Sequence, residues 1–391
     1  MIEKIFIKNF KSIGELSLNI GHFTCLVGMN GSGKTTVLQA IDFISQVMIG
    51  KIEPWMQARD WSVQDLNCRL RKESNITLNV CYRTASGQEV FWSASFNRHE
   101  MRCSSESVFL DRRKLIFQSK DQTYLIEDKP RQSIPFVYQG SILSKLKDSE
   151  LPDSIIEFRE YLWNVRSLEL LAPHLLRKAG RSDDWDIGAG GEKLSGYLHS
   201  VKGEARANLL TLLKAFYPNV VDFRVASLRA GWKKLYVVEQ FGERRLETEA
   251  SHLSDGLLRI LAVLTQTRSD RSLVLLDEIE NGINPEIIEK LVDALVESPQ
   301  QLLVTTHSPM ILNYLDDEVA RNSVQFIYKS PEGETRVRPF FSLPRIDAKL
   351  ESMGPGEAFV DTDMVALAAD CVEQDVIDAA AQHAREVEGL L

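Results

Sequence analysis

The sequence predicts an α/β fold in which a mixed β-sheet is flanked by helices. An apolar strand pattern at residues 23–27 runs directly into a glycine-rich loop, and apolar residues at helical spacing follow from residue 37. Residues 256–305 then alternate between helix and strand patterns, which is the order that brings parallel strands into one sheet. With 391 residues, 44% of them hydrophobic, the chain is able to bury a sizeable core.

Composition argues against several classes of protein. No apolar run approaches the ~20 residues needed to cross a bilayer, and no basic region followed by an apolar one opens the chain. We therefore expect a cytoplasmic protein with no membrane partner. The five cysteines are scattered without paired spacing, so neither a zinc site nor a disulfide framework is indicated. The net charge of -9 argues against nucleic-acid binding over the whole surface.

The periodicity of apolar residues predicts the elements in order. Three short apolar segments, separated by Gly14 and Gly21, predict three strands within residues 5–27. Alternation at residues 76–96 around a turn predicts an antiparallel hairpin, and helical spacing spans residues 152–216. The remaining predicted elements are strands near 223–228 and 234–239, a helix from 256, a strand at 273–276, a helix from 285, a strand at 302–305 and an Ala-rich acidic helix after 363. Neither coiled-coil heptads nor internal repeats are present.

Residues 28–35 match the complete phosphate-binding P-loop pattern, Gly28-x-x-x-x-Gly33-Lys34-Thr35, between a strand and a helix. Glycines let successive backbone N–H groups face the phosphates, and the N-terminus of the following helix attracts the same anion. Lys34 is expected to hold the β- and γ-phosphates of ATP and to be catalytic, and the Thr35 hydroxyl is expected to ligate Mg²⁺. A glycine-rich turn without function is the alternative. The loop residues predicted to bind nucleotide are Gly28, Asn30, Gly31, Ser32, Gly33, Lys34, Thr35 and Thr36.

The apolar strand at residues 273–276 ends in two carboxylates, Asp277 and Glu278. A buried strand that delivers charge at its C-terminal end is typical of α/β nucleotide sites. Asp277 is expected to hold Mg²⁺, and Glu278 to act as the catalytic residue that polarises the attacking water. The alternative is a pair of helix-capping acids.

With these motifs, the chain resembles the ABC-type ATPase heads of the SMC, RecF and OLD families. The closest resemblance is to the stand-alone OLD-like ATPases of bacterial anti-phage defence. It covers roughly the first fifty residues and residues 251–314, and the middle of the chain only by its layout. It implies a P-loop NTPase with an antiparallel β subdomain and a helical lobe carrying a signature motif. The implied single domain, residues 1–391, has a core at 1–50 and 251–345, a β-rich insertion at 73–140, a helical lobe at 150–220 and a helical tail at 363–391.

The resemblance also implies site residues. Ser254 and Gly256 lie where these families carry a Leu-Ser-Gly-Gly signature, which binds the nucleotide held by a second subunit, although Asp255 departs from the usual glycine. Residues 281–285 occupy the place of the loop that crosses the dimer interface. His307 follows the next strand as the switch histidine does, and is expected to be catalytic. The glutamine that contacts the metal in such families is placed at Gln139 by position alone.

Near the N-terminus, Lys11 is expected either close to the phosphates or on the surface as a solvated lysine. The chain lacks the long coiled coil of SMC proteins, and too few residues follow His307 for the nuclease domain of OLD nucleases. We therefore expect an ATPase without a nuclease of its own.

The expected function is a dimeric, ATP- and Mg²⁺-dependent ATPase that converts ATP and water to ADP and phosphate. As a homodimer or higher even-numbered oligomer, it would act as a sensor or regulator of a separately encoded effector in bacterial anti-phage defence. The alternative is a DNA-binding recombination or repair ATPase of the RecF or SMC kind, with DNA gripped by basic clusters lining one face. These clusters are residues 69–72, 112–114, 177–181 and 229–234. A third class, the motor of a membrane transporter, shares the ATP chemistry.

Overall fold

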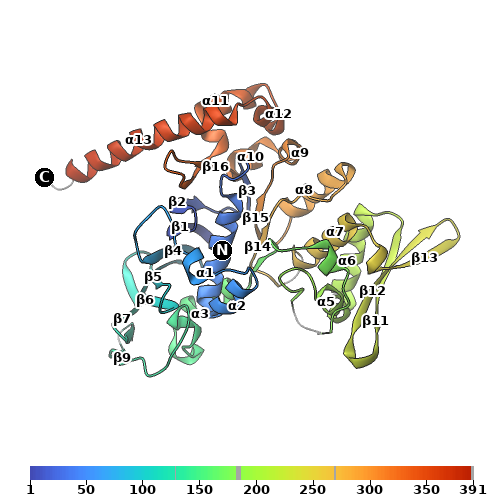
Figure 1. The fold of residues 1–391 in the computed structure, drawn as a ribbon, viewed down its shortest axis with the longest axis horizontal. Coiled ribbons are helices and arrows are strands. Elements are labelled where there is room, and N and C mark those ends of the chain that lie inside the picture. Colours follow the sequence, from blue (N-terminus) through green and yellow to red (C-terminus); the bar gives the residue numbers. More distant parts are fainter. Residues whose placement is uncertain (128, 182–185, 268–269, 389–391) are drawn as a thin grey trace.

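Strands of the described part of the chain assemble into three β-sheets, with helices between and around them (Figure 1). The computed structural model describes residues 1–391 except 128, 182–185, 268–269 and 389–391. Within the described residues, every helix is too short or too polar to traverse a lipid bilayer.

The largest sheet is antiparallel and contains eight strands, in the order β2-β1-β4-β5-β6-β7-β8-β9. Its strands are β1 (Ile2–Phe10), β2 (Ile13–Asn19), β4 (Asn75–Arg83), β5 (Glu89–Asn97), β6 (Arg102–Leu110), β7 (Lys114–Lys120), β8 (Thr123–Ile126) and β9 (Gln132–Ser133). Alternate residues of β5 are buried, as expected for a sheet with one face on the core. The first two strands of the chain therefore join the predicted β-rich insertion, and not the sheet that contains β3 (Phe23–Val27).

The second sheet has six strands in the order β10-β14-β15-β3-β16-β17, all parallel except the last pair. Its other strands are β10 (Val165–Ser167), β14 (Leu273–Leu276), β15 (Gln301–Thr305), β16 (Val324–Lys329) and β17 (Thr335–Pro339). Every residue of β3, β14 and β15 is buried, which matches their continuous apolar runs. This sheet confirms the predicted α/β fold with a mixed sheet.

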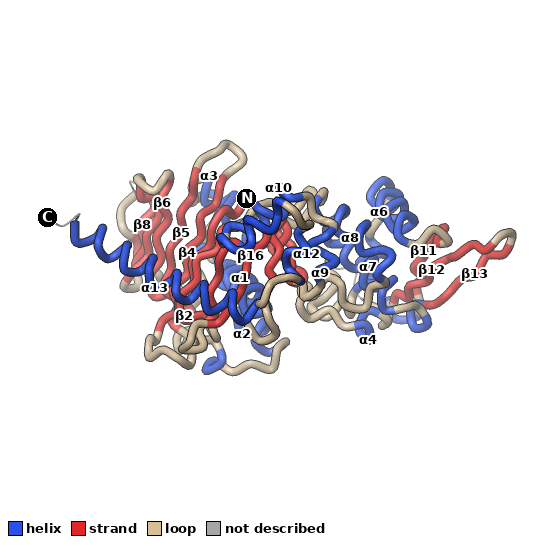
Figure 2. The backbone as a smooth tube through the Cα atoms, turned by 90° about the horizontal axis from the view of Figure 1, so that it is seen from above, coloured by secondary structure: helices blue, strands red, loops and turns tan. Residues whose placement is uncertain are grey.

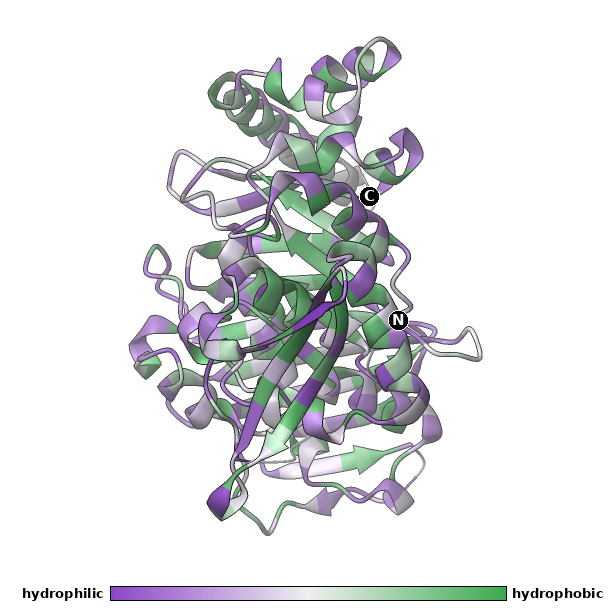
Figure 3. Ribbon diagram, turned by 90° about the vertical axis from the view of Figure 1, so that its right-hand side faces the viewer, coloured by the Kyte–Doolittle hydropathy of each residue, from purple (hydrophilic) through white to green (hydrophobic). Residues whose placement is uncertain are grey.

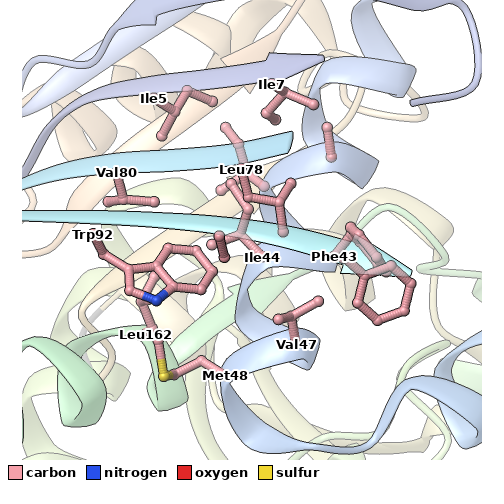
Figure 4. Close-up of a cluster of buried hydrophobic side chains, with 14 of the residues drawn as sticks. Ile5, Ile7, Phe43, Ile44, Val47, Met48, Leu78, Val80, Trp92 and Leu162 are labelled. Carbon is pink, nitrogen blue, oxygen red and sulfur yellow. The ribbon is translucent and has the colours of Figure 1, made fainter. Parts of the chain in front are cut away.

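Helix α1 (Lys34–Ile49) lies between these two sheets. Figure 4 shows its Phe43, Ile44 and Val47 beside apolar side chains of β1, β4 and β5. Helix α3 (Asp153–Trp163) also packs on α1, and the Ser45 hydroxyl donates to the Leu162 carbonyl at 2.8 Å. Although its sequence position groups α3 with the helical lobe, the structure places it in the core.

The helical lobe contains α4 (Pro173–Leu176), α5 (Leu194–Ser200), α6 (Gly203–Phe216) and α7 (Asp255–Thr267), and lies on the other side of the six-stranded sheet. A three-stranded antiparallel sheet projects from it: β11 (Val220–Ser227), β12 (Lys233–Phe241) and β13 (Arg244–Glu249). Figures 1 and 2 show these strands at one end of the molecule, and Figure 3 views the molecule from that side. Strand β13 was not predicted, because four of its six residues are charged and none is buried.

The remaining described helices lie outside the helical lobe. They are α2 (Ile52–Gln57), α8 (Ile288–Val296), α9 (Pro309–Asn313), α10 (Asp317–Ser323), α11 (Pro344–Asp347), α12 (Pro355–Val360) and α13 (Met364–Glu388). Short 3₁₀ turns lie at Val63–Asp65, Ile142–Ser144, Asp148–Glu150, Arg229–Gly231, Ala250–His252, Pro285–Ile287, Phe340–Ser342 and Ala348–Glu351. Arg338 of β17 anchors α13 through Asp375 and Asp378, both at 2.6 Å.

Candidate nucleotide-binding site

The candidate site lies at the C-terminal edge of the six-stranded sheet. The glycine loop follows β3, Asp277 follows the parallel strand β14, and His307 lies two residues after β15. Because neighbouring parallel strands end at the same edge, residues far apart in sequence meet there, and this edge is where ligands of α/β sheets bind.

The glycine loop is shaped by close contacts with the C-terminal part of the chain. Gly28 and Gly33 have φ angles of 149° and 108°, which side chains with a Cβ rarely adopt. A Cβ on Gly28 would collide with the Ile327 carbonyl of β16, and one on Gly33 with the Thr335 hydroxyl of β17. Asn30 and Gly31 are exposed at the tip of the loop. The fold itself therefore requires glycine at positions 28 and 33, in addition to any need for the backbone to approach a ligand closely.

The N-terminus of α1 is suited to an anion. No side chain caps it, so its first backbone N–H groups are open to a ligand. The Ser32 hydroxyl is buried and has no hydrogen-bond partner among the described residues. The Lys34 ammonium donates to the carbonyls of Gly28 at 2.9 Å and Met29 at 3.1 Å. Burial lowers the pKa of Lys34, and nearby carboxylates oppose that shift. A phosphate in this cradle would meet all of these donors.

Asp277 joins the glycine loop to β15. One of its carboxylate oxygens accepts from the Thr35 hydroxyl at 2.9 Å, and the other from the Thr305 hydroxyl at 2.5 Å. A hydroxyl and a carboxylate oxygen side by side are ligands that Mg²⁺ uses together with phosphate oxygens and water. Within the described ranges, no group of three or more His, Cys, Asp or Glu side chains could hold a metal alone. The donor set therefore fits Mg²⁺ brought in with a nucleotide.

Glu278 has an unusual backbone, with a φ of 46°. Its N–H donates to the Thr305 hydroxyl at 2.8 Å, and its carbonyl accepts from Arg259 of α7 at 2.9 Å. These bonds hold the strained conformation in place. The Glu278 carboxylate is 49% exposed and lies 3.9 Å from Nε2 of His307. Glu278 and His307 therefore stand together at the open side of the site.

A second carboxylate, Glu280, fixes the segment that carries His307. It accepts from the His307 backbone N–H at 2.8 Å and from the Thr306 hydroxyl at 3.0 Å. Nδ1 of His307 lies 3.4 Å from the Lys34 ammonium. Sequence reasoning missed Glu280, and only its place two residues after Glu278 could have signalled it.

Gln139 does not lie at the site, so its prediction as a metal ligand is wrong. The backbone N–H of Ser141 donates to the Val47 carbonyl at 2.7 Å, at the C-terminal end of α1. That helix has 16 residues and so separates Gln139 from Lys34 by about 24 Å.

Glu169, and not Gln139, follows a strand of the six-stranded sheet at the edge where the glycine loop lies. It stands two residues after β10. It accepts hydrogen bonds from Gln39 of α1 and, at 3.1 Å, from Arg59. Lys11 donates to the same Gln39 at 2.7 Å and lies 3.5 Å above the Trp61 ring. Burial lowers the pKa of Lys11 to about 8. Lys11 is thus packed beside α1 and is not the solvated surface lysine of one alternative. Its approach to the phosphates stays a prediction.

The signature segment opens α7. The Ser254 hydroxyl accepts from the Leu257 N–H at 3.3 Å and so caps the helix. Asp255 forms an ion pair with Arg177, which also donates to the Leu253 carbonyl at 3.0 Å. The carboxylate of Asp255, the residue that replaces the usual glycine of the signature, is thus paired with Arg177.

Close packing explains why position 256 is a glycine. A Cβ there would lie 2.7 Å from the Gly282 carbonyl, so α7 and the 281–285 loop are in close contact. Among described residues, no hydrogen bond joins Ser254 or Gly256 to the glycine loop, and their nucleotide-binding role stays a prediction. Thr36 is placed near the loop, where its hydroxyl accepts from Ser12 at 3.4 Å.

Comparisons with known proteins agree with this geometry. Residues 23–313 match the family model described as "AAA domain, putative AbiEii toxin, Type IV TA system". A crystal structure of an Smc head bound to the C-winged helix domain of ScpA is similar over 86% of this chain and 96% of that one, with a TM-score of 0.53 and 17% identity. A crystal structure of an Smc head with an extended coiled coil, bound to the C-terminal domain of ScpA from Pyrococcus furiosus, is similar over 90% of this chain and 99% of that one. Its TM-score is 0.52 and the sequence identity is 14%. These likenesses show an SMC-head-like fold.

Two curated relatives match over short segments. The OLD nuclease of Thermus scotoductus is 43% identical over 44 residues, and the chromosome partition protein Smc of Methanocaldococcus jannaschii is 54% identical over 44 residues. Each segment is 11% of this chain but only 8% and 4% of the respective relative, so the match spans less than a tenth of either protein.

Proposed function

Since the chain belongs to the AAA-domain family described as putative AbiEii toxin of a type IV toxin–antitoxin system, we propose that it binds and hydrolyses ATP at the site above. The observation that carries the proposal is Asp277 held between Thr35 and Thr305, next to a strained Glu278 that faces His307. Sites with this arrangement activate water for attack on a phosphate.

Each residue has a role that its position supports. The N-terminus of α1 and Lys34 hold the phosphates and neutralise their charge. Thr35 and Asp277 would hold Mg²⁺, which would supply further positive charge to neutralise the phosphates. The Glu278 carboxylate orients a water molecule and accepts its proton, while His307 donates a hydrogen bond at the γ-phosphate. Glu280 positions His307 through the backbone and does not touch the substrate.

Replacement of Glu278 by Gln tests the catalytic assignment. An amide keeps the size of the side chain but accepts no proton, so we expect the rate of phosphate release to fall about a hundredfold or more while ATP binding is retained. Glu289→Gln, on the exposed face of α8, is the matched control and should hydrolyse ATP at the normal rate. An unchanged rate in Glu278→Gln would refute the assignment.

The same proposal extends to assembly and biology. Two copies would sandwich two ATP molecules, each between the glycine loop of one copy and Ser254 and Gly256 of the other. The complex would act in the cytoplasm of a bacterium as a sensor that regulates a separately encoded effector in anti-phage defence. The toxin–antitoxin description of the family, the OLD nuclease segment and the ScpA domains bound to similar Smc heads support this extension. Co-purification of a nuclease or toxin that depends on ATP would test it.

The DNA-binding alternative is not favoured. Its four basic clusters were expected on one face, yet Arg112 lies at the β6–β7 turn, paired with Glu89 at 2.5 Å. Arg229 lies at the β11–β12 turn, at the opposite end of the molecule in Figures 1 and 2. A single duplex-binding face across all four clusters is therefore absent from the described residues.

A further inference from the structure

A cavity of about 700 Å³ lies where the helical lobe meets the core. Ala58, at the end of α2, and Leu170, after β10, line it from the core side. Leu175 of α4 and Trp232 of the β11–β12 turn line it from the lobe side. Small-molecule sites commonly have volumes of roughly 300–1,000 Å³ and occur at such junctions. The cavity is separate from the glycine loop, none of whose residues lines it.

Most of its described lining residues are small or apolar, one of them is the aromatic Trp232, and the charged ones are mainly basic. Lys178, Arg181 and Lys193 contribute three positive charges, against one carboxylate, Glu192. That carboxylate already accepts from the Gly190 N–H at 3.0 Å. The Trp232 side chain is 43% exposed, which is unusual for a residue of its size. An indole ring beside cations suits a ligand with both an aromatic ring and negative charge.

The fold brings two of the basic segments of the sequence together here. Gly180 and Lys233 exchange two backbone hydrogen bonds, at 3.0 and 2.6 Å. Arg181 donates through Nε to the Ala230 carbonyl at 3.1 Å. The exposed Arg229 therefore extends the positive charge of Lys178 and Arg181 beyond the mouth of the cavity, along the β11–β12 turn.

We propose that this cavity binds a nucleotide, with its base stacked on Trp232 and its phosphate held by Lys178 and Arg181. The nucleotide comes either free or as the end of a single strand of nucleic acid. Base stacking on an aromatic side chain accepts any base, and Lys and Arg neutralise phosphates. The positive charge of Arg229 beyond the mouth of the cavity would attract the neighbouring phosphates of a nucleic-acid strand.

The cavity is also connected to both halves of the ATP site. Leu175 and Lys178 flank Arg177, whose guanidinium holds Asp255 and the Leu253 carbonyl at the start of α7. Leu170 follows Glu169, which is hydrogen-bonded to Gln39 of α1. A ligand that moves α4 would thus shift the signature helix through Arg177, and one that moves Leu170 would shift the glycine-loop helix through Glu169. This regulatory effect rests on the proposed ATPase function, whereas binding in the cavity does not.

Fluorescence anisotropy with two labelled probes, AMP and a single strand of ten thymidines, tests the binding. The full chain carries Lys34→Ala, so that the glycine loop no longer competes for nucleotide. Adding Trp232→Ala or Lys178→Ala should weaken binding about tenfold or more, because one stacked base contributes roughly 1–3 kcal/mol. Trp232→Phe keeps an aromatic ring and should restore most of the affinity, which shows that the lobe still folds.

Matched controls are Phe241→Ala, another exposed aromatic residue of the same small sheet, and Arg112→Ala at the far end of the molecule. Both should bind within about twofold of the parent chain, as expected for residues outside the cavity. Binding of AMP identifies a free nucleotide as the source, and binding of the strand alone identifies a nucleic-acid end. No binding of either probe at low salt, or equal binding by the Trp232→Ala and Lys178→Ala chains, overturns the proposal. Because binding is read without ATP hydrolysis, an inactive ATP site leaves this result intact.

Discussion

At the scale of single residues, hydrogen bonds within the protein hold the two acids of the proposed ATP site in place. Thr305 donates to Asp277 and accepts from the Glu278 backbone, so one hydroxyl fixes both acids. Arg259 binds the carbonyls of the same two residues, at 2.7 and 2.9 Å. Burial lowers the pKa of Arg259, and the carboxylates around it oppose that change. The carboxylate that we propose to activate water is therefore held in position by the protein itself.

A different buried acid makes stability depend on pH. Glu106 of β6 is 1% exposed and accepts hydrogen bonds from Ser141, the Ile142 N–H and Trp92. Burial outweighs these bonds and raises the pKa of Glu106 from 4.5 to about 7. The folded state therefore binds this proton more tightly than the unfolded chain, and the stabilisation, full below about pH 4.5, is lost as pH rises through about 7.

Glu106→Gln should remove this dependence. Between pH 4.5 and 7, the wild type should lose up to roughly 3 kcal/mol of unfolding free energy relative to the Gln variant. Urea unfolding of both chains at a series of pH values measures the difference. Parallel curves for the two chains would show that folding does not change the pKa of Glu106.

At the scale of elements, helix α7 links the lobe to the core through a contact that tolerates no side chain. Its Gly256 approaches the Gly282 carbonyl so closely that an added Cβ would lie 2.7 Å from that oxygen. Gly256→Ala must push α7 and the 281–285 loop apart, at a cost of about 1–3 kcal/mol. We expect the melting temperature to fall by several degrees.

The matched control is Gly354→Ala, at the start of α12, where an added Cβ meets its nearest atom at an ordinary 3.6 Å. This variant should melt close to the wild type. Equal melting temperatures of the two variants would show that the loop yields without cost.

The elements also show what the sequence could reveal. The glycine loop, Asp277 and His307 were predictable because each follows an apolar strand within two residues, so a local pattern marks them. The prediction of Gln139 as a metal ligand was wrong, and Glu169 was missed. The reason is that β10 has only three residues and pairs with a strand more than a hundred residues later. Local periodicity gives no signal for such a pairing. For the same reason, nothing in the patterns of β1 and β2 told which sheet they join.

At the scale of the whole molecule, the single chain holds half of each proposed ATP site. Ser254 and Gly256 make no hydrogen bond to the glycine loop among the described residues, and in the proposed dimer they contact the nucleotide of the second copy. With ATP and Mg²⁺, the slow-hydrolysing Glu278→Gln chain should therefore sediment as a dimer.

Ser254→Arg places a bulky cation at this contact and should keep the chain monomeric while ATP still binds. Analytical ultracentrifugation together with a nucleotide-binding assay separates the two effects. A Glu278→Gln chain that stays monomeric with ATP bound would exclude the sandwich.

One feature of the glycine loop bears on how the protein is made. The loop is synthesised before the elements that enclose it, because the strands on either side of β3 are β15 and β16 and the Thr335 hydroxyl donates to the Ser32 carbonyl at 3.0 Å across 303 positions. Domains usually fold as units during synthesis, N-terminal parts first. The glycine loop is therefore enclosed only after β15, β16 and Thr335 have been synthesised. A chain interrupted before β16 would carry the whole P-loop motif and yet form no nucleotide site, so unfinished copies could not mimic the ATP-bound state.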